Sequence, residues 1–90
     1  MISIFKYPVN ITDEQMVAMP KGAEILSVQV QHGSACLWAM VNTENPNTFR
    51  RINIKGTGHP IHGELGTFIG TVQFDNGVLV FHVFDGGENG

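Results

Sequence analysis

The segment from Gly56 to Gly66 holds four glycines, a proline and two histidines between two strand-like stretches. Because glycine adopts backbone angles closed to other residues, successive amides in such a loop can turn the same way and bind an anion. The two histidines can add side-chain donors. We therefore expect the loop to bind a small anionic ligand through Gly56, Thr57, Gly58, His59 and His62.

Two basic residues of the preceding strand can bring positive charge to the same end of the sheet. Lys55 directly precedes the loop and Arg51 lies four residues earlier, so an extended strand places both on one face. Trp38, if exposed, can stack on a base. The loop lacks the glycine spacing of dinucleotide folds and P-loops, and no helix is expected after it. The alternative is that its glycines serve only the turn geometry.

Metal and catalytic chemistry have less support. His59, His62, Glu64 and His82 can supply metal ligands, but two histidines three residues apart outside a helix have no preset convergence. Cys36 stands among apolar strand residues, which indicates a buried small side chain and not a nucleophile. We expect no metal, no cofactor and no enzyme activity.

Length and charge limit the partners. Ninety residues make one domain, and a domain of this size buries only about 60% of the surface that its unfolded chain exposes. A single cysteine excludes an intramolecular disulfide, which leaves oligomerisation or a histidine metal site as the usual supplement, and we expect a homo-oligomer. The net charge of −3 disfavours duplex nucleic acid, and no apolar run reaches the roughly 20 residues that cross a bilayer. A reduced cytoplasmic location without membrane partners is the simplest interpretation.

The elements that must position the loop are β-strands. Short runs of Val, Ile, Phe and Thr are separated by Gly, Asn and Pro, which is typical of strands joined by tight turns. We expect an all-β fold, a small antiparallel two-sheet sandwich or partly open barrel built from hairpins, in a single domain over 1–85. Residues 86–90 are rich in glycine and are expected to form a flexible tail. The expected strands lie near 2–7, 15–19, 24–32, 35–42, 48–55, 67–74 and 78–84.

Two hairpins can be registered from their turns. Asn76-Gly77 favours a type I′ turn, because both residues tolerate positive φ. Gly33-Ser34 favours a type II′ turn. The first register pairs Phe74 with Leu79, Val72 with Phe81 and Gly70 with Val83. The second pairs Val30 with Leu37, Val28 with Ala39 and Leu26 with Val41.

Each hairpin has one apolar face and one mixed face, as expected when two sheets pack across a shared core. The mixed faces carry Trp38 and Met40 in one hairpin and Ile69, Val80 and Phe84 in the other. These side chains form a subunit interface, an exposed ligand platform, or a surface covered within the chain by strand 2–7. All three alternatives stay open at this point.

Six segments resemble a family of small uncharacterised proteins encoded by bacteriophages and prophages. The resemblance spans nearly the whole chain, and its segments are FKYP at 5–8, MPKGAEILSVQ at 19–29, CLWA at 36–39, GTGHPI at 56–61, IGT at 69–71 and LVFHVF at 79–84. It implies expression in the cytoplasm of an infected bacterium and an accessory, counter-defence role.

Three functions fit that setting. In the first, the loop sequesters a nucleotide-derived host signalling molecule without cleaving it, with Arg51 and Trp38 assisting. In the second, the mixed faces with Trp38 and Met40 dock on a host defence protein and inhibit it. In the third, the protein is a minor structural or assembly component of the phage particle. The loop composition favours the first.

Overall fold

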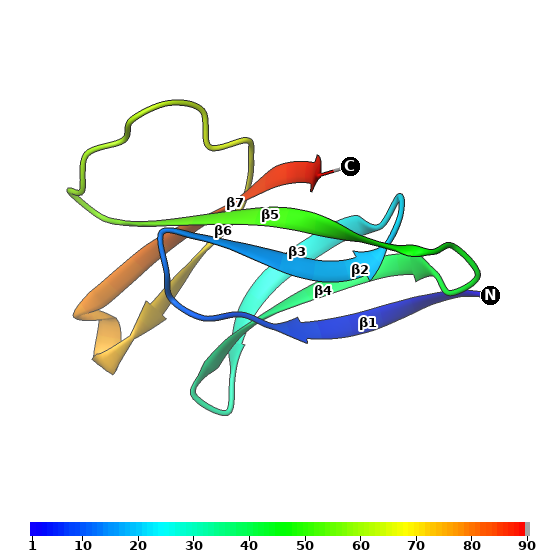
Figure 1. Cartoon of the computed structure of the whole chain (residues 1–90). Coiled ribbons are helices and arrows are strands. Elements are labelled where there is room, and N and C mark those ends of the chain that lie inside the picture. Colours follow the sequence, from blue (N-terminus) through cyan, green and yellow to red (C-terminus); the bar gives the residue numbers. More distant parts are fainter. Residues whose placement is uncertain (90) are drawn as a thin grey trace.

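The computed structural model describes residues 1–89, which form two stacked antiparallel sheets (Figure 1). Sheet A has the strand order β1-β4-β3, and sheet B has the order β2-β5-β7-β6. The sheets do not close into a barrel, so the all-β, two-sheet prediction is confirmed in its sandwich form. The bounds are β1 Ile2–Pro8, β2 Glu14–Pro20, β3 Glu24–Gln31, β4 Ser34–Asn42, β5 Asn47–Gly56, β6 Thr67–Phe74 and β7 Leu79–Asn89, with a short 3₁₀ turn at Asp75–Gly77.

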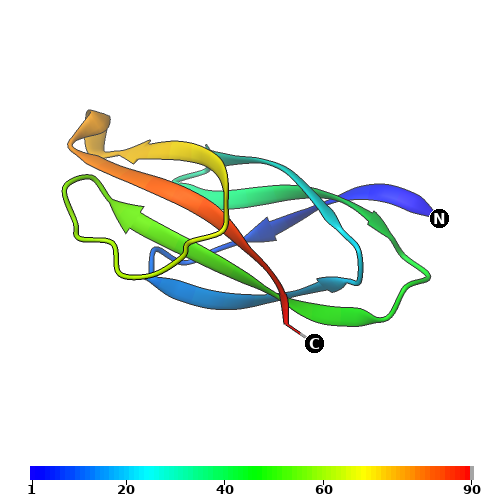
Figure 2. The same ribbon diagram turned by 90° about the horizontal axis from the view of Figure 1, so that it is seen from above.

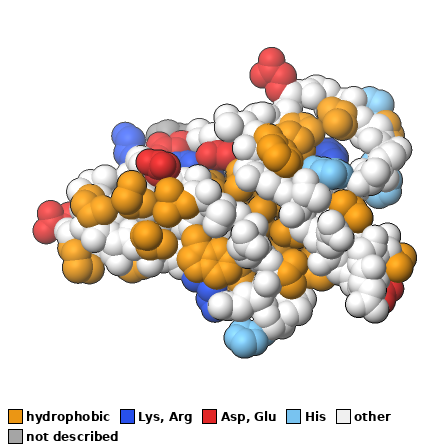
Figure 3. Space-filling view, turned by 180° about the vertical axis from the view of Figure 1, so that it is seen from behind, with side chains coloured by type: hydrophobic (Ala, Val, Ile, Leu, Met, Phe, Trp, Pro, Cys, Tyr) orange, Lys and Arg blue, Asp and Glu red, His pale blue; other side chains and the backbone are white. Residues whose placement is uncertain are grey.

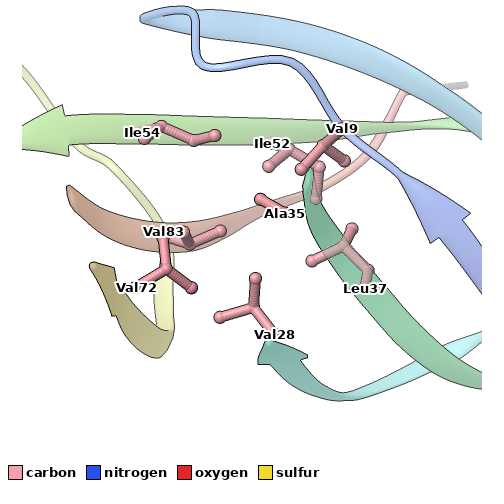
Figure 4. Packing of buried hydrophobic residues seen from close by; sticks show 8 residues of the cluster. All are labelled: Val9, Val28, Ala35, Leu37, Ile52, Ile54, Val72 and Val83. Atoms are coloured by element: carbon pink, nitrogen blue, oxygen red, sulfur yellow. The ribbon is translucent and has the colours of Figure 1, made fainter. Parts of the chain in front are cut away.

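The core lies between the two sheets. Strand residues that alternate in sequence point to opposite faces, so the inward positions of both sheets interleave in one apolar layer (Figure 4). The larger group of buried side chains comprises Val9, Val28, Ala35, Leu37, Ile52, Ile54, Val72 and Val83, and a smaller one comprises Met19, Ala23, Ala39 and Val41. Leu37 and Ile52, one from each sheet, are completely buried.

The β6–β7 hairpin has the register expected from its turn. Phe74 pairs with Leu79, Val72 with Phe81 and Gly70 with Val83. Asn76 has φ 54° and ψ 34°, Gly77 has φ 86°, and the Val78 amide donates to the Asp75 carbonyl at 3.0 Å, as in a type I′ turn.

This hairpin departs from the prediction at one place, a register shift between Phe68 and Gly70. The shift turns Ile69 inward, where it packs against the core, so its assignment to the mixed face is wrong. The two sheets pack closely at the same place, since a Cβ at Gly70 would lie 3.0 Å from a methyl carbon of Val28 in β3.

In the β3–β4 hairpin the predicted turn is one residue too late. His32 and Gly33, with φ of 52° and 78°, occupy the turn, and Gln31 pairs with Ser34. The observed partner of Val28 is Leu37 instead of Ala39, so the predicted register is wrong. Since each partner moves by two positions, the same side chains still share a face.

Nearer the start of β3, a register shift between Ile25 and Ser27 has a larger effect. Ile25 packs against the core, and Leu26, predicted to lie on the apolar face, is 43% exposed. The bulge adds one residue to β3, which reverses the faces beyond it.

Strand β1 lies beside β4 in the same sheet and does not cross over its mixed face. Ile4 pairs with Met40, and Lys6 pairs with Trp38. Met40 therefore remains 38% exposed and Trp38 half-buried on the outer face of sheet A. The suggestion that residues 2–7 cover these side chains is wrong.

The end of the chain also differs from the prediction. Residues 86–89 do not form a tail but continue β7, in which Gly87 pairs with Arg51 and Glu88 with Arg50 of β5. The backbone of the glycine-rich segment is held by the neighbouring strand, which composition alone does not show. Gly90 lies outside the described residues.

A candidate ligand-binding loop

The loop 57–66 leaves β5, arches over the outer face of sheet B and returns to β6 (Figures 1 and 2). At its start the Thr57 amide donates to the Val80 carbonyl of β7, and the His59 amide closes a turn onto the Gly56 carbonyl, both at 3.1 Å. Gly58 has φ 86°, which the turn requires. The start of the loop is thus hydrogen-bonded to the sheet.

The far end of the loop is held as firmly. The Asn53 amide group, buried on the outer side of β5, donates to the Leu65 carbonyl at 2.7 Å. Gly66, with φ 100°, passes so close to β7 that a Cβ there would lie 2.0 Å from the Asp85 carbonyl oxygen. Between these two anchors, residues 57–64 are exposed.

The imidazole of His59 folds back over the backbone of Gly56. A Cβ at position 56 would lie 2.9 Å from a ring carbon of His59, so only glycine leaves room for this placement. Beside the ring is an open pocket of about 350 Å³ at the end of sheet B, lined by Gly56, Thr57, His59, Val78, Leu79, Val80 and Phe81. Its floor is apolar and its polar groups come from the start of the loop.

A three-residue hydrogen-bond chain supports the loop start. The Nε2 atom of His82 lies 2.7 Å from the Thr57 hydroxyl oxygen, and its Nδ1 lies 3.0 Å from the Thr71 hydroxyl oxygen. Thr71 and His82 are direct cross-strand partners. Because hydroxyl groups both donate and accept, neutral or protonated imidazole can keep both contacts. The hairpin register places Thr71 opposite His82, but nothing local indicates that Thr57 joins them.

The two basic residues share the outer face of β5, since the intervening Ile52 and Ile54 are buried. Neither lines the pocket. The Lys55 ammonium lies 3.5 Å from Asp13, and the Arg51 guanidinium lies 3.9 Å from Glu14. The pairing of β2 with β5 brings these carboxylates close, which the reasoning from the sequence did not include.

Two other expected site residues stand apart from the pocket. His62 is exposed in the middle of the loop and is not among the residues that line the pocket. Trp38 lies on the outer face of sheet A, across the sandwich from the loop. Within one chain, the structure brings Gly56, Thr57 and His59 together and leaves Trp38 separate.

The whole chain, residues 1–90, matches the family described as domain of unknown function DUF7352. The chain belongs to this family. Comparison with curated proteins and with solved structures gives no match.

In residues 1–89, no three His, Cys, Asp or Glu side chains are grouped so that they could hold a metal ion. In the same range, no helix is long and apolar enough to cross a membrane.

The sequence reasoning missed a buried ionic group at the opposite end of sheet B. Arg50 is 5% exposed and contacts Asp85 at 2.9 Å, Glu88 at 3.3 Å and the Ala23 carbonyl at 2.6 Å. Glu88 also accepts a hydrogen bond from the Gly22 amide. That backbone bond, followed by the contact with Arg50, lowers the pKa of Glu88. These contacts fasten the end of β7 to the β2–β3 turn.

Proposed function

We propose that this protein is a non-enzymatic binding protein that holds a small anionic, nucleotide-derived molecule at the start of the loop 57–66. The observation that carries the proposal is the pocket of about 350 Å³ between His59 and the β6–β7 hairpin. Small-molecule sites usually combine an apolar floor with a few polar groups that fix orientation, and this pocket has that composition.

The pocket divides into two chemical regions. Leu79, Val80 and Phe81 offer apolar surface that suits the flat face of a base. Thr57 and His59 offer a hydroxyl and an exposed imidazole that suit an anionic or hydrogen-bonding group. Gly58 and Gly63 both have positive φ and lie in the exposed part of the loop.

Positive charge is available near the loop without lining the pocket. Exposed ion pairs such as Arg51 with Glu14 contribute about 0–1 kcal/mol, so an anionic ligand can compete for the cation. Lys55 is the direct cross-strand partner of His82, which places its stem beside the support of the loop start.

Binding without catalysis is supported by the surroundings of Thr57. Its hydroxyl lies next to His82, the arrangement of a nucleophile and a base. The same hydroxyl also lies 3.4 Å from the Val80 carbonyl oxygen, and the backbone amide of Thr57 donates to that carbonyl. These contacts tie Thr57 to the sheet, and we assign His82 a supporting role.

The resemblance to small bacteriophage proteins supports a setting for this activity. Sequestering a nucleotide-derived signal in the cytoplasm of an infected bacterium would blunt a defence that depends on the signal. A binding protein of this kind needs no cofactor, and its capacity is set by its abundance.

The test is recovery of the ligand. Purified protein is incubated with an extract of bacteria whose nucleotide-signalling defences are active, washed and denatured, and the released small molecules are identified by mass spectrometry. We expect a phosphate-containing molecule in stoichiometric amount. A washed protein that releases none would refute the proposal.

Two histidine variants of the same loop give a matched comparison. His59→Ala removes a side chain that lines the pocket, so ligand retention should fall at least tenfold. His62→Ala removes an exposed side chain outside the pocket and should retain the ligand. The free energy of unfolding of both variants should lie within about 0.5 kcal/mol of that of the native protein, because exposed side chains contribute little stability. Equal loss of ligand in both variants would contradict the assignment of the pocket.

A second candidate function, docking on a host defence protein, is favoured by one observation. The outer face of sheet A exposes 63% of Ile2, 56% of Ile4 and 38% of Met40, next to the half-buried Trp38. Contiguous apolar surface of this kind commonly marks a contact site. Capture of one host protein that Met40→Lys abolishes, with no released small molecule, would favour docking over sequestration.

A further inference from the structure

Strand β1 presents an uninterrupted free edge. In residues 1–89 it pairs with β4 alone, at the border of sheet A (Figure 1). Among the four edge strands, β3 and β6 are each broken by a bulge, whereas β1 and β2 each keep a regular register over seven residues. A regular edge is the part of a sheet best able to accept another strand.

The hydrogen bonds at both ends of β1 show which residues point outward. The Thr43 amide donates to the Met1 carbonyl at 2.9 Å, and the Val9 amide donates to the Ala35 carbonyl at 3.0 Å. In an antiparallel pair the two backbone groups of a residue point to the same side, and the side alternates along the strand. Odd-numbered residues therefore face β4, and the backbone groups of Ile2, Ile4 and Lys6 face the free edge.

Apolar side chains accompany this free edge. Ile2 and Ile4 are more than half exposed on the outer face, and Phe5, which points toward the core side, is still 40% exposed. Figure 3 shows hydrophobic side chains on the half of the molecule that holds the N-terminus, with others across the middle and beside the arch of the loop. The edge thus combines unpaired backbone groups with apolar surface.

We propose that β1 pairs antiparallel with β1 of a second copy about a twofold axis at Ile4, joining the two three-stranded sheets into one of six strands. In this register Ile4 faces Ile4 of the second copy, and Ile2 faces Lys6. All three outward amides then have acceptors, and Pro8, which has no amide hydrogen, lies beyond the paired segment.

Charge and the proline disfavour registers with an axis nearer Pro8. An axis at Lys6 would place two lysines directly opposite each other, which destabilises a strand pair. An axis at Phe5 would place Pro8 opposite Ile2, where a donor is missing. With the axis at Ile4, the two lysines are separated by roughly 14 Å along and across the strands.

Two single-cysteine substitutions test the register. In a hydrogen-bonded antiparallel pair the facing Cα atoms lie about 5.5 Å apart, within the range of a disulfide. Ile4→Cys should therefore form a covalent dimer rapidly under mild oxidation, and Lys6→Cys should cross-link at least tenfold more slowly. The native Cys36 is buried and serves as an internal control for random oxidation. Equal rates, or faster cross-linking of Lys6→Cys, would overturn the proposed register.

The assembly itself is tested by mass measurement over a concentration series. We expect a dimer of about twice the 9.8 kDa chain mass, and Ile4→Lys should convert it to monomer by placing two charges on the axis. Val78→Lys is the control, because Val78 is 74% exposed at the hairpin tip of the other sheet. The proposal would be overturned if the protein stayed monomeric at every concentration, or if its β1 edge paired only with a different protein. Equal dissociation of the two lysine variants would also overturn it.

Discussion

Alanine at Gly66 should destabilise the protein far more than alanine at Gly63, although both glycines lie in the same loop with positive φ. The two have φ of 100° and 90°, so each substitution carries the cost of a left-handed backbone, about 1–2 kcal/mol. At Gly63 a Cβ would meet nothing within 4 Å. At Gly66 it would lie 2.0 Å from the Asp85 carbonyl oxygen, 2.7 Å from its carbon and 2.8 Å from the Cα of Gly86.

The extra cost follows from what must move. An ordinary contact begins at 3.4 Å, so the loop and β7 must separate by about 1.4 Å, the difference between 3.4 and 2.0 Å. Asp85 is paired with Ile52 on one side and Thr67 on the other, so the movement strains both ladders. Loss of two backbone hydrogen bonds at about 1 kcal/mol each gives a difference of about 2 kcal/mol between the variants.

Urea denaturation measures this difference directly. With an m-value of about 1–2 kcal/mol/M, the urea midpoint of Gly66→Ala should be roughly 1–2 M lower than that of Gly63→Ala. A change of midpoint without a change of m would show that stability alone is affected. Equal midpoints would refute the view that the far end of the loop is fixed by contact with β7.

Two further predictions concern hydrogen bonds that the structure assigns. Because the pKa of Glu88 is lowered in the folded protein, its stabilising contribution is present above the ordinary value of 4.5 and is lost as the pH falls through the lowered value. Urea midpoints should therefore fall with acid less steeply in Glu88→Gln, and an unchanged slope would contradict this. Thr57→Val should lower the free energy of unfolding by about 1 kcal/mol, because His82 loses the partner of its Nε2 atom. It should also speed hydrogen exchange at the loop start, and unchanged exchange at the His59 amide would argue against a supporting role for His82.

The sequence predicts the parts of the fold that depend on neighbouring residues. Asn76 and Gly77 are among the few residues that favour a type I′ turn, and the turn then sets the β6–β7 register. The predicted β3–β4 turn is one residue too late because His32, at which positive φ is less common than at glycine, adopts this conformation. Local chemistry predicts a turn only where the required residue type is present.

The parts that the sequence does not predict depend on contacts between distant residues. The bulge at Ile69 accompanies the close approach of Gly70 to Val28 of the other sheet. The order of residues 86–89 depends on Arg50 and the Gly22 amide, which are more than 30 residues away in the sequence. Such contacts are consequences of the fold and leave no local pattern.

The candidate site shows the same division. Glycine and histidine content identified the loop, and Gly56, Thr57 and His59 do line its pocket. The pocket floor comes from the start of β7, more than 18 residues later, and the partners of Lys55 and Arg51 come from β2 and the turn before it. Trp38 lies apart from the pocket within one chain, because facing away from the core does not say which of the two outer faces a residue occupies.

The loop and the free edge lie on different sheets, so the two proposals can fail separately. Pairing through β1 extends sheet A and leaves the outer face of sheet B uncovered, because no residue that lines the pocket belongs to β1, β3 or β4. A dimer would then carry two equivalent, well-separated pockets. Since a ligand at one pocket touches nothing in the second copy, the monomeric variant Ile4→Lys should bind with the same affinity per chain. Weaker binding by that variant would mean that the pocket is completed by the second copy, and the register of β1 would have to be reconsidered.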